Sequence, residues 1–215
     1  SAEIDADALS AFVRAQYAAA GLEPGEIDTG ALILTGVAVR RANARAIGEV
    51  FSAEAGKFVA LSAGDALETL MAAHGSGAAA LSRKGGPVLN IDVGGGTTKL
   101  ALCVAGEPVA MTAVEAGARL VAFDEEGRIA RVERFGARYL ALGGYHFGAG
   151  DRLPADGRRR VAGLMADKVM QAIDGYDLHD FLRLPPLDQA AAPVRVQFSG
   201  GVSEYVYGRA RGGFG

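Results

Sequence analysis

The first part of the chain alternates between two patterns of apolar and polar residues. Apolar residues recur at helical spacing over residues 4–20, and Gly21 is the expected stop. Short apolar runs at 31–36 and 57–61 predict buried strands. A helix is expected between these strands, and another at 64–74. Helices that alternate with buried strands are typical of a parallel sheet covered by helices on both faces.

The pattern changes after residue 86. Three apolar segments at 87–94, 98–106 and 107–117 follow one another closely. The links between them are too short for a crossover helix, so the strands are expected to be antiparallel. A further hairpin is predicted over 119–132, where the sequence Glu-Glu-Gly supplies the turn.

The last part of the chain repeats a construction from the first. A helix at 157–173 and a proline-rich link lead to a strand at 194–198, which ends in Ser-Gly-Gly before a closing helix. The strand at 31–36 likewise ends in a hydroxyl residue and a glycine before a helix. We therefore expect a duplicated α/β fold of two lobes, 1–86 and 87–215, with mixed sheets covered by helices and truncated at both ends.

Composition fits an ordinary globular protein. Of 215 residues, 50% are hydrophobic and 22% are charged, and the net charge is −3, which gives no basic surface for nucleic acid. No run approaches the roughly 20 apolar residues of a membrane-spanning helix, and the start shows no secretory signal. The single cysteine, Cys103, fits a reducing cytoplasm and a small buried apolar role.

The segment VLNIDVGGGTTKLAL (88–102) carries the strongest chemical signal. A dinucleotide fingerprint is disfavoured, because the residues after its glycines read as a strand and not as a helix. A plain hairpin turn leaves Asp92 unexplained, since a carboxylate at the end of a buried run needs water, a donor or a metal. Three glycines let backbone N–H groups approach an anion without a Cβ in the way. We therefore predict a nucleotide phosphate turn, in which Asp92 holds Mg²⁺ through water.

Two motifs resemble the actin-like ATPase superfamily, which has a ribonuclease H-like fold. The segment NIDVGGGTTKLAL is similar to its second phosphate hairpin, here 88–104, and VQFSGGVSEYVYG is similar to its adenosine-side motif, here 196–205. The ordered set of motifs, which also includes DTGALILTG, FVALSAG and AAHGSGAAALS, resembles the ethanolamine ammonia-lyase reactivating proteins of ethanolamine utilisation. This resemblance runs through nearly all of the chain, which would make up about half of a family member.

The resemblance implies an ATP-dependent, chaperone-like reactivating factor. Its target would be adenosylcobalamin-dependent ethanolamine ammonia-lyase, from which it would release damaged cobalamin so that intact cofactor can rebind. It also implies ATP and Mg²⁺ as cofactors, a cytoplasmic protein associated with a bacterial microcompartment, and the possibility of a homo-oligomer. The implied site residues are the metal-associated acid Asp92, the phosphate hairpin, the adenosine-side turn and the end of the first lobe's strand: Asp92, Gly94, Gly95, Gly96, Thr97, Thr98, Ser199, Gly200, Gly201, Thr35 and Gly36.

Two departures from the family pattern bear on turnover. The superfamily's first phosphate hairpin would precede residue 1, and Val37 stands where the family carries a glutamate. We therefore expect the chain as given to hydrolyse ATP poorly or not at all. Two other classes stay open: a small-molecule kinase of the same superfamily, and a filament-forming actin-like structural ATPase.

Other candidate groups read as structural. Ser199 lacks the glycine of a nucleophile elbow. The acids and histidine at 174–181 are typical of a solvated loop. The arginines at 158–160 are expected to lie on a solvated surface, with an acidic partner surface as the alternative.

Overall fold

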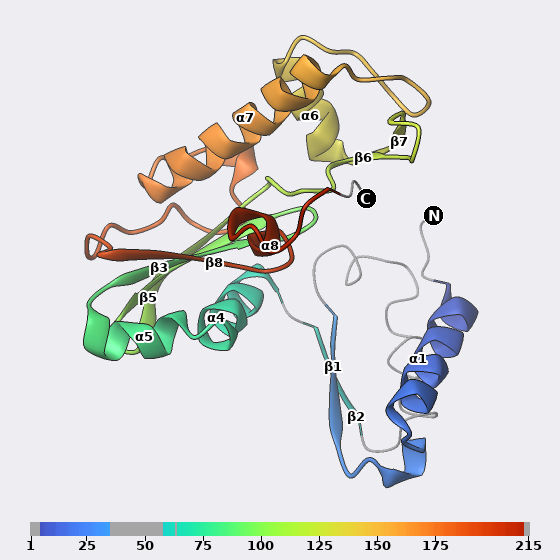
Figure 1. Ribbon diagram of the computed structural model, residues 1–215. Helices are drawn as coiled ribbons and strands as arrows, with labels where there is room; N and C mark the ends of the chain where they lie inside the picture. Colours follow the sequence, from blue (N-terminus) through green and yellow to red (C-terminus); the bar gives the residue numbers. More distant parts are fainter. Residues whose placement is uncertain (1–4, 35–57, 63, 213–215) are drawn as a thin grey trace. The chain divides into compact units, whose positions relative to one another are not determined.

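The computed structural model describes residues 5–34, 58–62 and 64–212 (Figure 1). The sequence-predicted Thr35 and Gly36 lie outside these residues, as do Val37 and the helix expected behind the first strand. The chain divides into two compact units, Ser1–Gly64 and Asp65–Gly215.

The first unit contains one long helix and a pair of strands. Helix α1 (Ala6–Ala20) begins after Asp5, whose side chain accepts a hydrogen bond from the Ala8 backbone N–H at 2.9 Å. It ends at Gly21, which adopts a left-handed conformation with φ 67°. A 3₁₀ turn (Pro24–Glu26) leads to β1 (Gly30–Leu34), which pairs in parallel with β2 (Phe58–Ser62). The predicted first helix, its glycine stop and the parallel pairing are confirmed.

The second unit is built on a mixed four-stranded sheet in the order β5-β4-β3-β8. Strands β3 (Val88–Val93), β4 (Thr98–Val104) and β5 (Glu107–Val114) are antiparallel neighbours, as predicted. Strand β8 (Arg195–Ser199) returns from far along the chain and runs parallel to β3. The α/β class and the mixed sheet expected from the sequence are confirmed.

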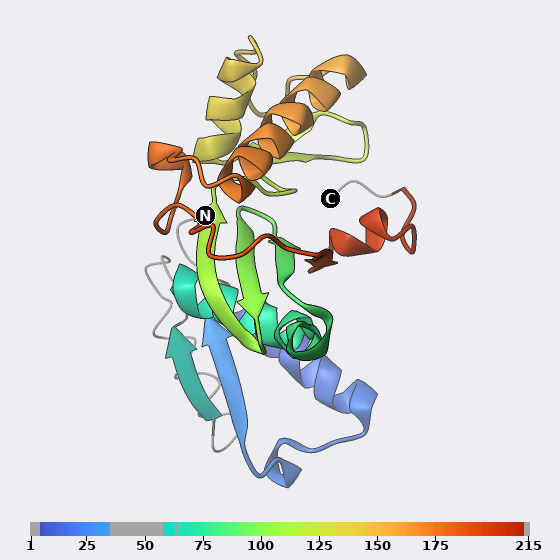
Figure 2. The same ribbon diagram turned by 90° about the vertical axis from the view of Figure 1, so that its left-hand side faces the viewer.

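Helices cover both faces of this sheet (Figures 1 and 2). Helices α4 (Asp65–Gly75) and α5 (Ala78–Gly85) pack on one face through alanines at 73, 78 and 79, which meet Val88, Ala101 and Cys103. The small side chains let helix and sheet come close. The larger core fills the other face, where α6 (Arg134–Leu142) and α7 (Ala155–Ile173) contribute Tyr139 and Val161.

The boundary between the units differs from the predicted one at 86/87. Helices α4 and α5 belong with the later strands, because their apolar faces pack on β3, β4 and β5. The sequence pattern assigned the helix expected at 64–74 to the first lobe, since it continues the helix–strand alternation, and it predicted no helix at Ala78–Gly85. The order of elements shows which element comes next, whereas packing decides which core each helix joins.

Two further features complete the second unit. The predicted hairpin forms from β6 (Val121–Phe123) and β7 (Ile129–Val132), which are antiparallel. Helix α6 was missed, because the stretch before α7 reads as loop-rich. Its buried Phe135, Tyr139 and Leu140 have helical spacing, which is the signal that could have revealed it. Strand β8 leads into the short helix α8 (Ser203–Val206).

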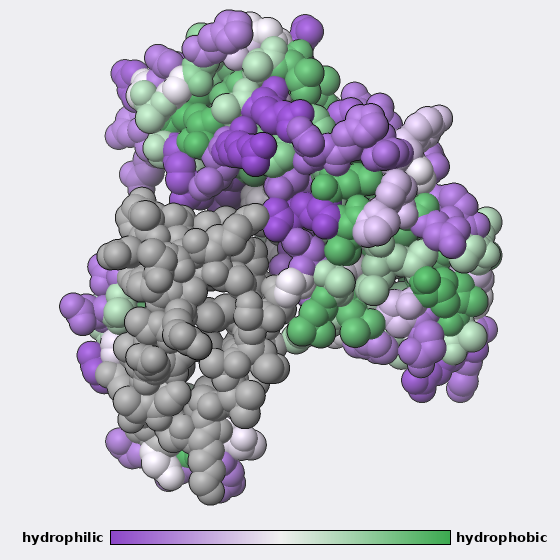
Figure 3. Space-filling model, turned by 180° about the vertical axis from the view of Figure 1, so that it is seen from behind, coloured by the Kyte–Doolittle hydropathy of each residue, from purple (hydrophilic) through white to green (hydrophobic). Residues whose placement is uncertain are grey.

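Apolar and polar side chains are interspersed on the face of the second unit seen from behind (Figure 3). Among the described residues, no helix is long and apolar enough to cross a membrane.

Candidate functional site

The predicted phosphate hairpin forms a tight turn between β3 and β4. The Gly94 backbone N–H donates to the Thr97 carbonyl at 2.9 Å and closes the turn. A Cβ on Gly94 would lie 3.1 Å from that same carbonyl oxygen, whereas a Cβ on Gly96 would meet nothing within 4 Å. Gly95 is exposed at the tip, and Thr97 is half-buried. The turn therefore presents bare backbone to its surroundings.

The loop that follows β5 supports this turn. The backbone N–H groups of Ala118 and Arg119 donate to the carbonyls of Gly94 and Gly95 at 3.0 and 2.7 Å. Gly117 makes the close approach possible, because a Cβ there would lie 2.6 Å from the Gly95 carbonyl oxygen. The loop thereby fixes the glycine turn and carries Arg119 to its side.

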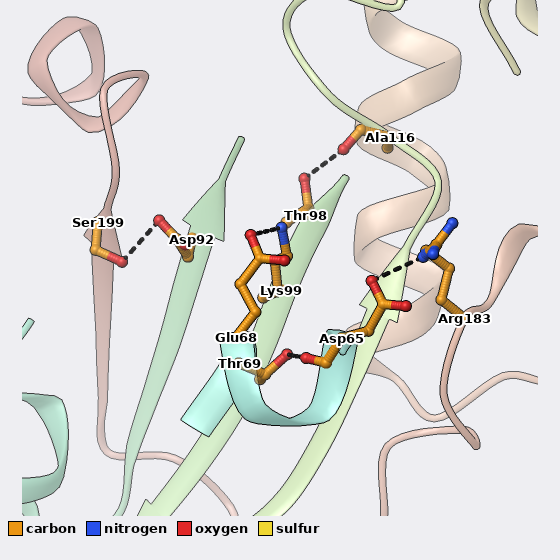
Figure 4. Close-up of polar contacts among 9 residues, drawn as sticks. All are labelled: Asp65, Glu68, Thr69, Asp92, Thr98, Lys99, Ala116, Arg183 and Ser199. Carbon is orange, nitrogen blue, oxygen red and sulfur yellow. Dashed lines mark hydrogen bonds and ion pairs between the residues drawn. The ribbon is translucent and has the colours of Figure 1, made fainter. Parts of the chain in front are cut away.

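Thr98 has a different role from the one predicted. The sequence suggested a hydroxyl donor for phosphate, but the Thr98 Oγ1 donates to the Ala116 carbonyl at 2.7 Å (Figure 4). The residue is only 1% exposed. As the first residue of β4, it faces the loop after β5 and not the open end of the turn. In this structure it therefore positions the turn from within.

An ion-pair network also anchors the loop after β5. Arg183 donates to Asp65 Oδ1 at 2.8 Å and to Glu115 Oε1 at 2.7 Å. The hydrogen bond to Asp65 is the main reason that the pKa of Arg183 is raised, with burial opposing it and Glu115 adding to it. Because Asp65 begins α4 and Glu115 begins the supporting loop, Arg183 ties the two segments together.

Asp92 and Ser199 lie side by side on the adjacent parallel strands β3 and β8. The Ser199 hydroxyl donates to Asp92 Oδ1 at 3.2 Å (Figure 4). It also accepts a hydrogen bond from Asn90 Nδ2 at 3.2 Å. Gly200 follows with φ 79°, and a Cβ there would clash with Asp92 Oδ1. The two sequence motifs, distant in the chain, therefore meet at the ends of neighbouring strands.

A partly buried ion pair lies on the same face of the sheet as Asp92. Lys99 is the cross-strand partner of Asp92, yet its Nζ pairs with Glu68 Oε1 of α4 at 2.6 Å (Figure 4). The Lys99 side chain is 5% exposed. Lys99 also reaches the glycine turn, because a Cβ on Gly94 would lie 3.8 Å from its Nζ. No local sequence pattern indicates this pair.

A pocket of about 640 Å³ opens on the other face of β3. Gly94 and Gly95 line it from the phosphate hairpin, and Gly201 lines it from the turn after β8. Its remaining lining is mostly apolar and comes from the loop after β5, from β6, from Leu153 in the link between α6 and α7, and from α7, together with Val93, Val202 and Tyr205. Among the described residues that line it, the only charged side chains are Arg119 and Arg158.

The predicted site residues differ in whether they line this pocket, and Gly96, Thr97, Thr98 and Gly200 are not among the residues that line it. Gly94, Gly95 and Gly201 share the pocket. Asp92 and Ser199 do not line it, because Asp92 precedes the pocket-lining Val93 and successive strand residues point to opposite faces. Thr35 and Gly36 lie outside the described residues.

Sequence reasoning missed the pocket's two cations. Arg119 had no motif around it, and Arg158 was placed in a solvated arginine cluster. Arg158 lies over the Phe123 ring, 5.5 Å from its centroid, and remains exposed. Only the packing of α7 against the β6–β7 hairpin brings it to the pocket.

The remaining candidates keep structural roles. Cys103 is fully buried, and burial raises the pKa of its thiol, so it is a poor nucleophile. Asp177 accepts from the His179 backbone N–H at 2.8 Å, as expected for a capped loop. Within the described ranges, no cluster of three or more histidine, cysteine or acidic side chains could hold a metal ion.

Comparison with known families gives one match over almost the whole chain. A family model described as "Ethanolamine utilisation protein EutA" matches residues 1–212. Two curated proteins named ethanolamine ammonia-lyase reactivase EutA, from Salmonella typhimurium and Escherichia coli, are each 36% identical over 210 residues. The match covers 91% of this chain and 43% of each curated protein, so the chain spans less than half of their length.

Solved structures show only low likeness. An MreB5 of Spiroplasma citri bound to AMPPNP has 21% identity and a TM-score of 0.31, over 53% of this chain and 32% of that protein. An exopolyphosphatase from Cytophaga hutchinsonii has 12% identity and a TM-score of 0.44, over 95% of this chain and 55% of that protein.

Proposed function

Since this chain belongs to the EutA family of ethanolamine utilisation proteins, we propose that it is the nucleotide-binding part of an ATP-dependent reactivating factor for ethanolamine ammonia-lyase. The two curated relatives carry the name of that reactivase. We assign this chain the actin-like ATPase fold, because its sequence motifs resemble those of that superfamily.

The observation that carries nucleotide binding is the pocket beside β3. Glycine turns from two distant motifs, 94–95 and 201, open onto one cavity of about 640 Å³. Bare backbone suits close approach by phosphate, and the apolar walls suit a base and sugar. The only charges lining the cavity among the described residues are two arginines, which favour an anionic ligand. The residues present therefore fit ATP.

Asp92 is proposed to hold Mg²⁺ through water beside the glycine turn. Its carboxylate is half-buried at a strand end, and Ser199 fixes its orientation. Mg²⁺ is commonly held by one or two carboxylates together with phosphates and water, so a single acid suffices. Because Asp92 points to the face of β3 opposite the pocket, this role requires the phosphates to extend around the glycine turn, where the ion would neutralise their charge. Thr97 and Gly96 are proposed to complete the phosphate side of the site, and Gly200 the adenosine side.

The proposed cellular role follows from the family. Nucleotide binding would drive the release of damaged cobalamin from stalled ethanolamine ammonia-lyase, after which intact cofactor rebinds. The proposed location is the cytoplasm, with the target enzyme and in association with a microcompartment.

Isothermal titration tests the nucleotide step. We expect the 215-residue chain to bind ATP more tightly with Mg²⁺ than without, and Asp92→Asn to lose this Mg²⁺ effect while still binding ATP. Absence of ATP binding under both conditions would overturn the proposal.

Reactivation tests the cellular role. Ethanolamine ammonia-lyase inactivated with cyanocobalamin is mixed with the chain, ATP, Mg²⁺ and adenosylcobalamin, and the curated Salmonella typhimurium relative is the positive control. Recovered deamination that requires ATP supports the role. If lyase activity recovers with the Salmonella typhimurium relative but not with this chain, the proposed role of this chain is limited to nucleotide binding.

A further inference from the structure

The pocket beside β3 is lined by a positively charged side chain, Arg119, that no sequence motif indicates. Arg119 lies in the loop after β5, and its backbone N–H donates to the Gly95 carbonyl at 2.7 Å. Its side chain runs along the tip of the turn, since a Cβ on Gly95 would lie 3.7 Å from Arg119 Cβ and 3.8 Å from Arg119 Cδ. Arg119 is thus held at the glycine turn by its own backbone.

The guanidinium of Arg119 is available for a ligand. It is exposed and lines the pocket. In the part of the chain that the structure describes, no carboxylate pairs with it, whereas Arg131, Arg138, Arg183 and Arg209 all have acidic partners. No acidic side chain among the described residues lines the pocket. An arginine without a carboxylate partner at a glycine turn can engage phosphate oxygens with two parallel N–H groups.

The loop that carries Arg119 is firmly fixed. Thr98 bonds the Ala116 carbonyl at 2.7 Å, and Gly117 fits against the backbone of Gly95 and Gly96 only because it lacks a Cβ. Glu115 is tied to Arg183 at 2.7 Å. The position of the Arg119 backbone relative to the glycine turn is therefore set before any ligand arrives, which lowers the entropic cost of the contact.

We propose that Arg119 binds the phosphate chain of the nucleotide and makes this site selective for nucleoside di- and triphosphates over the free nucleoside. The inference rests on the proposed nucleotide pocket and names the side chain that recognises its phosphates. Arg158, on the α7 wall of the same pocket, supplies the second positive charge that favours an anion there.

Titration of the 215-residue chain with ATP, ADP, AMP and adenosine tests the proposal. Arg119→Gln should weaken ATP and ADP binding about ten- to a hundredfold, the range of a lost charge-assisted hydrogen bond, and leave adenosine binding unchanged. Arg119→Lys should recover part of the loss, because it restores charge without the planar fork. Raising the salt concentration should weaken ATP binding in the unmodified chain more than in Arg119→Gln.

Arg159→Gln is the matched control, because Arg159 is an exposed arginine on α7 that does not line the pocket. It should bind all four ligands as the unmodified chain does. Equal losses for ATP and adenosine in Arg119→Gln would indicate a distorted loop and overturn the inference. Unchanged ATP affinity in Arg119→Gln would overturn it while leaving the proposed function intact. An unmodified chain that binds none of the four ligands would overturn both.

Discussion

The Ser199 hydroxyl donates to Oδ1 of Asp92 at 3.2 Å, joining residues 107 positions apart in the chain. The contact exists because β8 pairs in parallel with β3, so that the two strands end at the same edge. One oxygen of Asp92 is thereby fixed next to the turn that begins at Gly200. The glycine turn after β3 and the turn after β8 are coupled through this bond.

Gly200→Ala should damage this junction. The residue has φ 79°, and an added Cβ would clash with Asp92 Oδ1, so strain and steric overlap act together. We expect the free energy of unfolding to fall by about 2 kcal/mol or more. Urea unfolding followed by circular dichroism measures this. Gly163→Ala is the control: Gly163 lies in α7 with nothing within 4 Å of its Cβ position, and it should gain about 0.5–1 kcal/mol from helix propensity. Equal effects in the two variants would contradict the assigned clash.

Gly95→Ala separates function from stability. A Cβ there would make only an ordinary contact, 3.7 Å from Arg119, and Gly95 has no left-handed backbone conformation. Unfolding free energy should therefore change by less than about 0.5 kcal/mol. ATP affinity should fall about tenfold, a loss of about 1.4 kcal/mol, because the methyl group keeps phosphate from the backbone. Calorimetric titration and urea unfolding of one preparation provide both values. Undiminished ATP affinity would show that phosphate does not approach this backbone.

Glu68→Ala should destabilise the second unit. It leaves the Lys99 ammonium, 5% exposed, without its partner at 2.6 Å. Because Glu68 is 21% exposed, the loss should be smaller than the roughly 3–5 kcal/mol of a fully buried pair. The double variant Glu68→Leu with Lys99→Met removes both charges and should recover most of that loss. Urea unfolding of the single and double variants tests the pair. A double variant as unstable as Glu68→Ala would assign the loss to packing instead of charge.

Tyr139→Phe should change the alkaline stability of the protein. The Tyr139 side chain is fully buried, and its hydroxyl has no hydrogen-bond partner among the described residues. Burial raises its pKa most, Glu115 raises it further, and Arg138 partly lowers it. The folded state thus holds this proton more tightly than the unfolded state. The contribution of Tyr139 to the free energy of unfolding is fully present below about pH 10, the usual tyrosine pKa. It is lost as the pH rises above that value.

The measurement is unfolding free energy at pH 8 and near pH 11. Tyr139→Phe should lose less stability between these values than the unmodified chain, and at pH 8 it should be within about 1 kcal/mol of it. Tyr176→Phe, at a 62% exposed position, is the control and should keep the pH dependence of the unmodified chain. Identical pH dependence in all three proteins would contradict the role of Tyr139.

Some of the site was predictable and some was not. The sequence indicated Gly94, Gly95 and Gly201, because glycines between a strand and another element leave the backbone accessible to a ligand. Thr98 looked like a ligand donor, and only its bond to the Ala116 carbonyl shows that its hydroxyl is already used. Arg119 and Lys99 had no local signal, since an arginine or lysine in a sequence reads equally well as solvated surface.

The sequence by itself determined the helices and strands with regular apolar spacing, the antiparallel run from β3 to β5, the glycine turns and the family. These depend on periodicity and on local backbone requirements, which are written in neighbouring residues. Only the tertiary structure decided that α4 and α5 join the second unit, that Asp92 faces away from the pocket, and that Arg119 and Arg158 face into it. These depend on which surfaces pack together across long separations in the chain, and packing is a property of the whole fold.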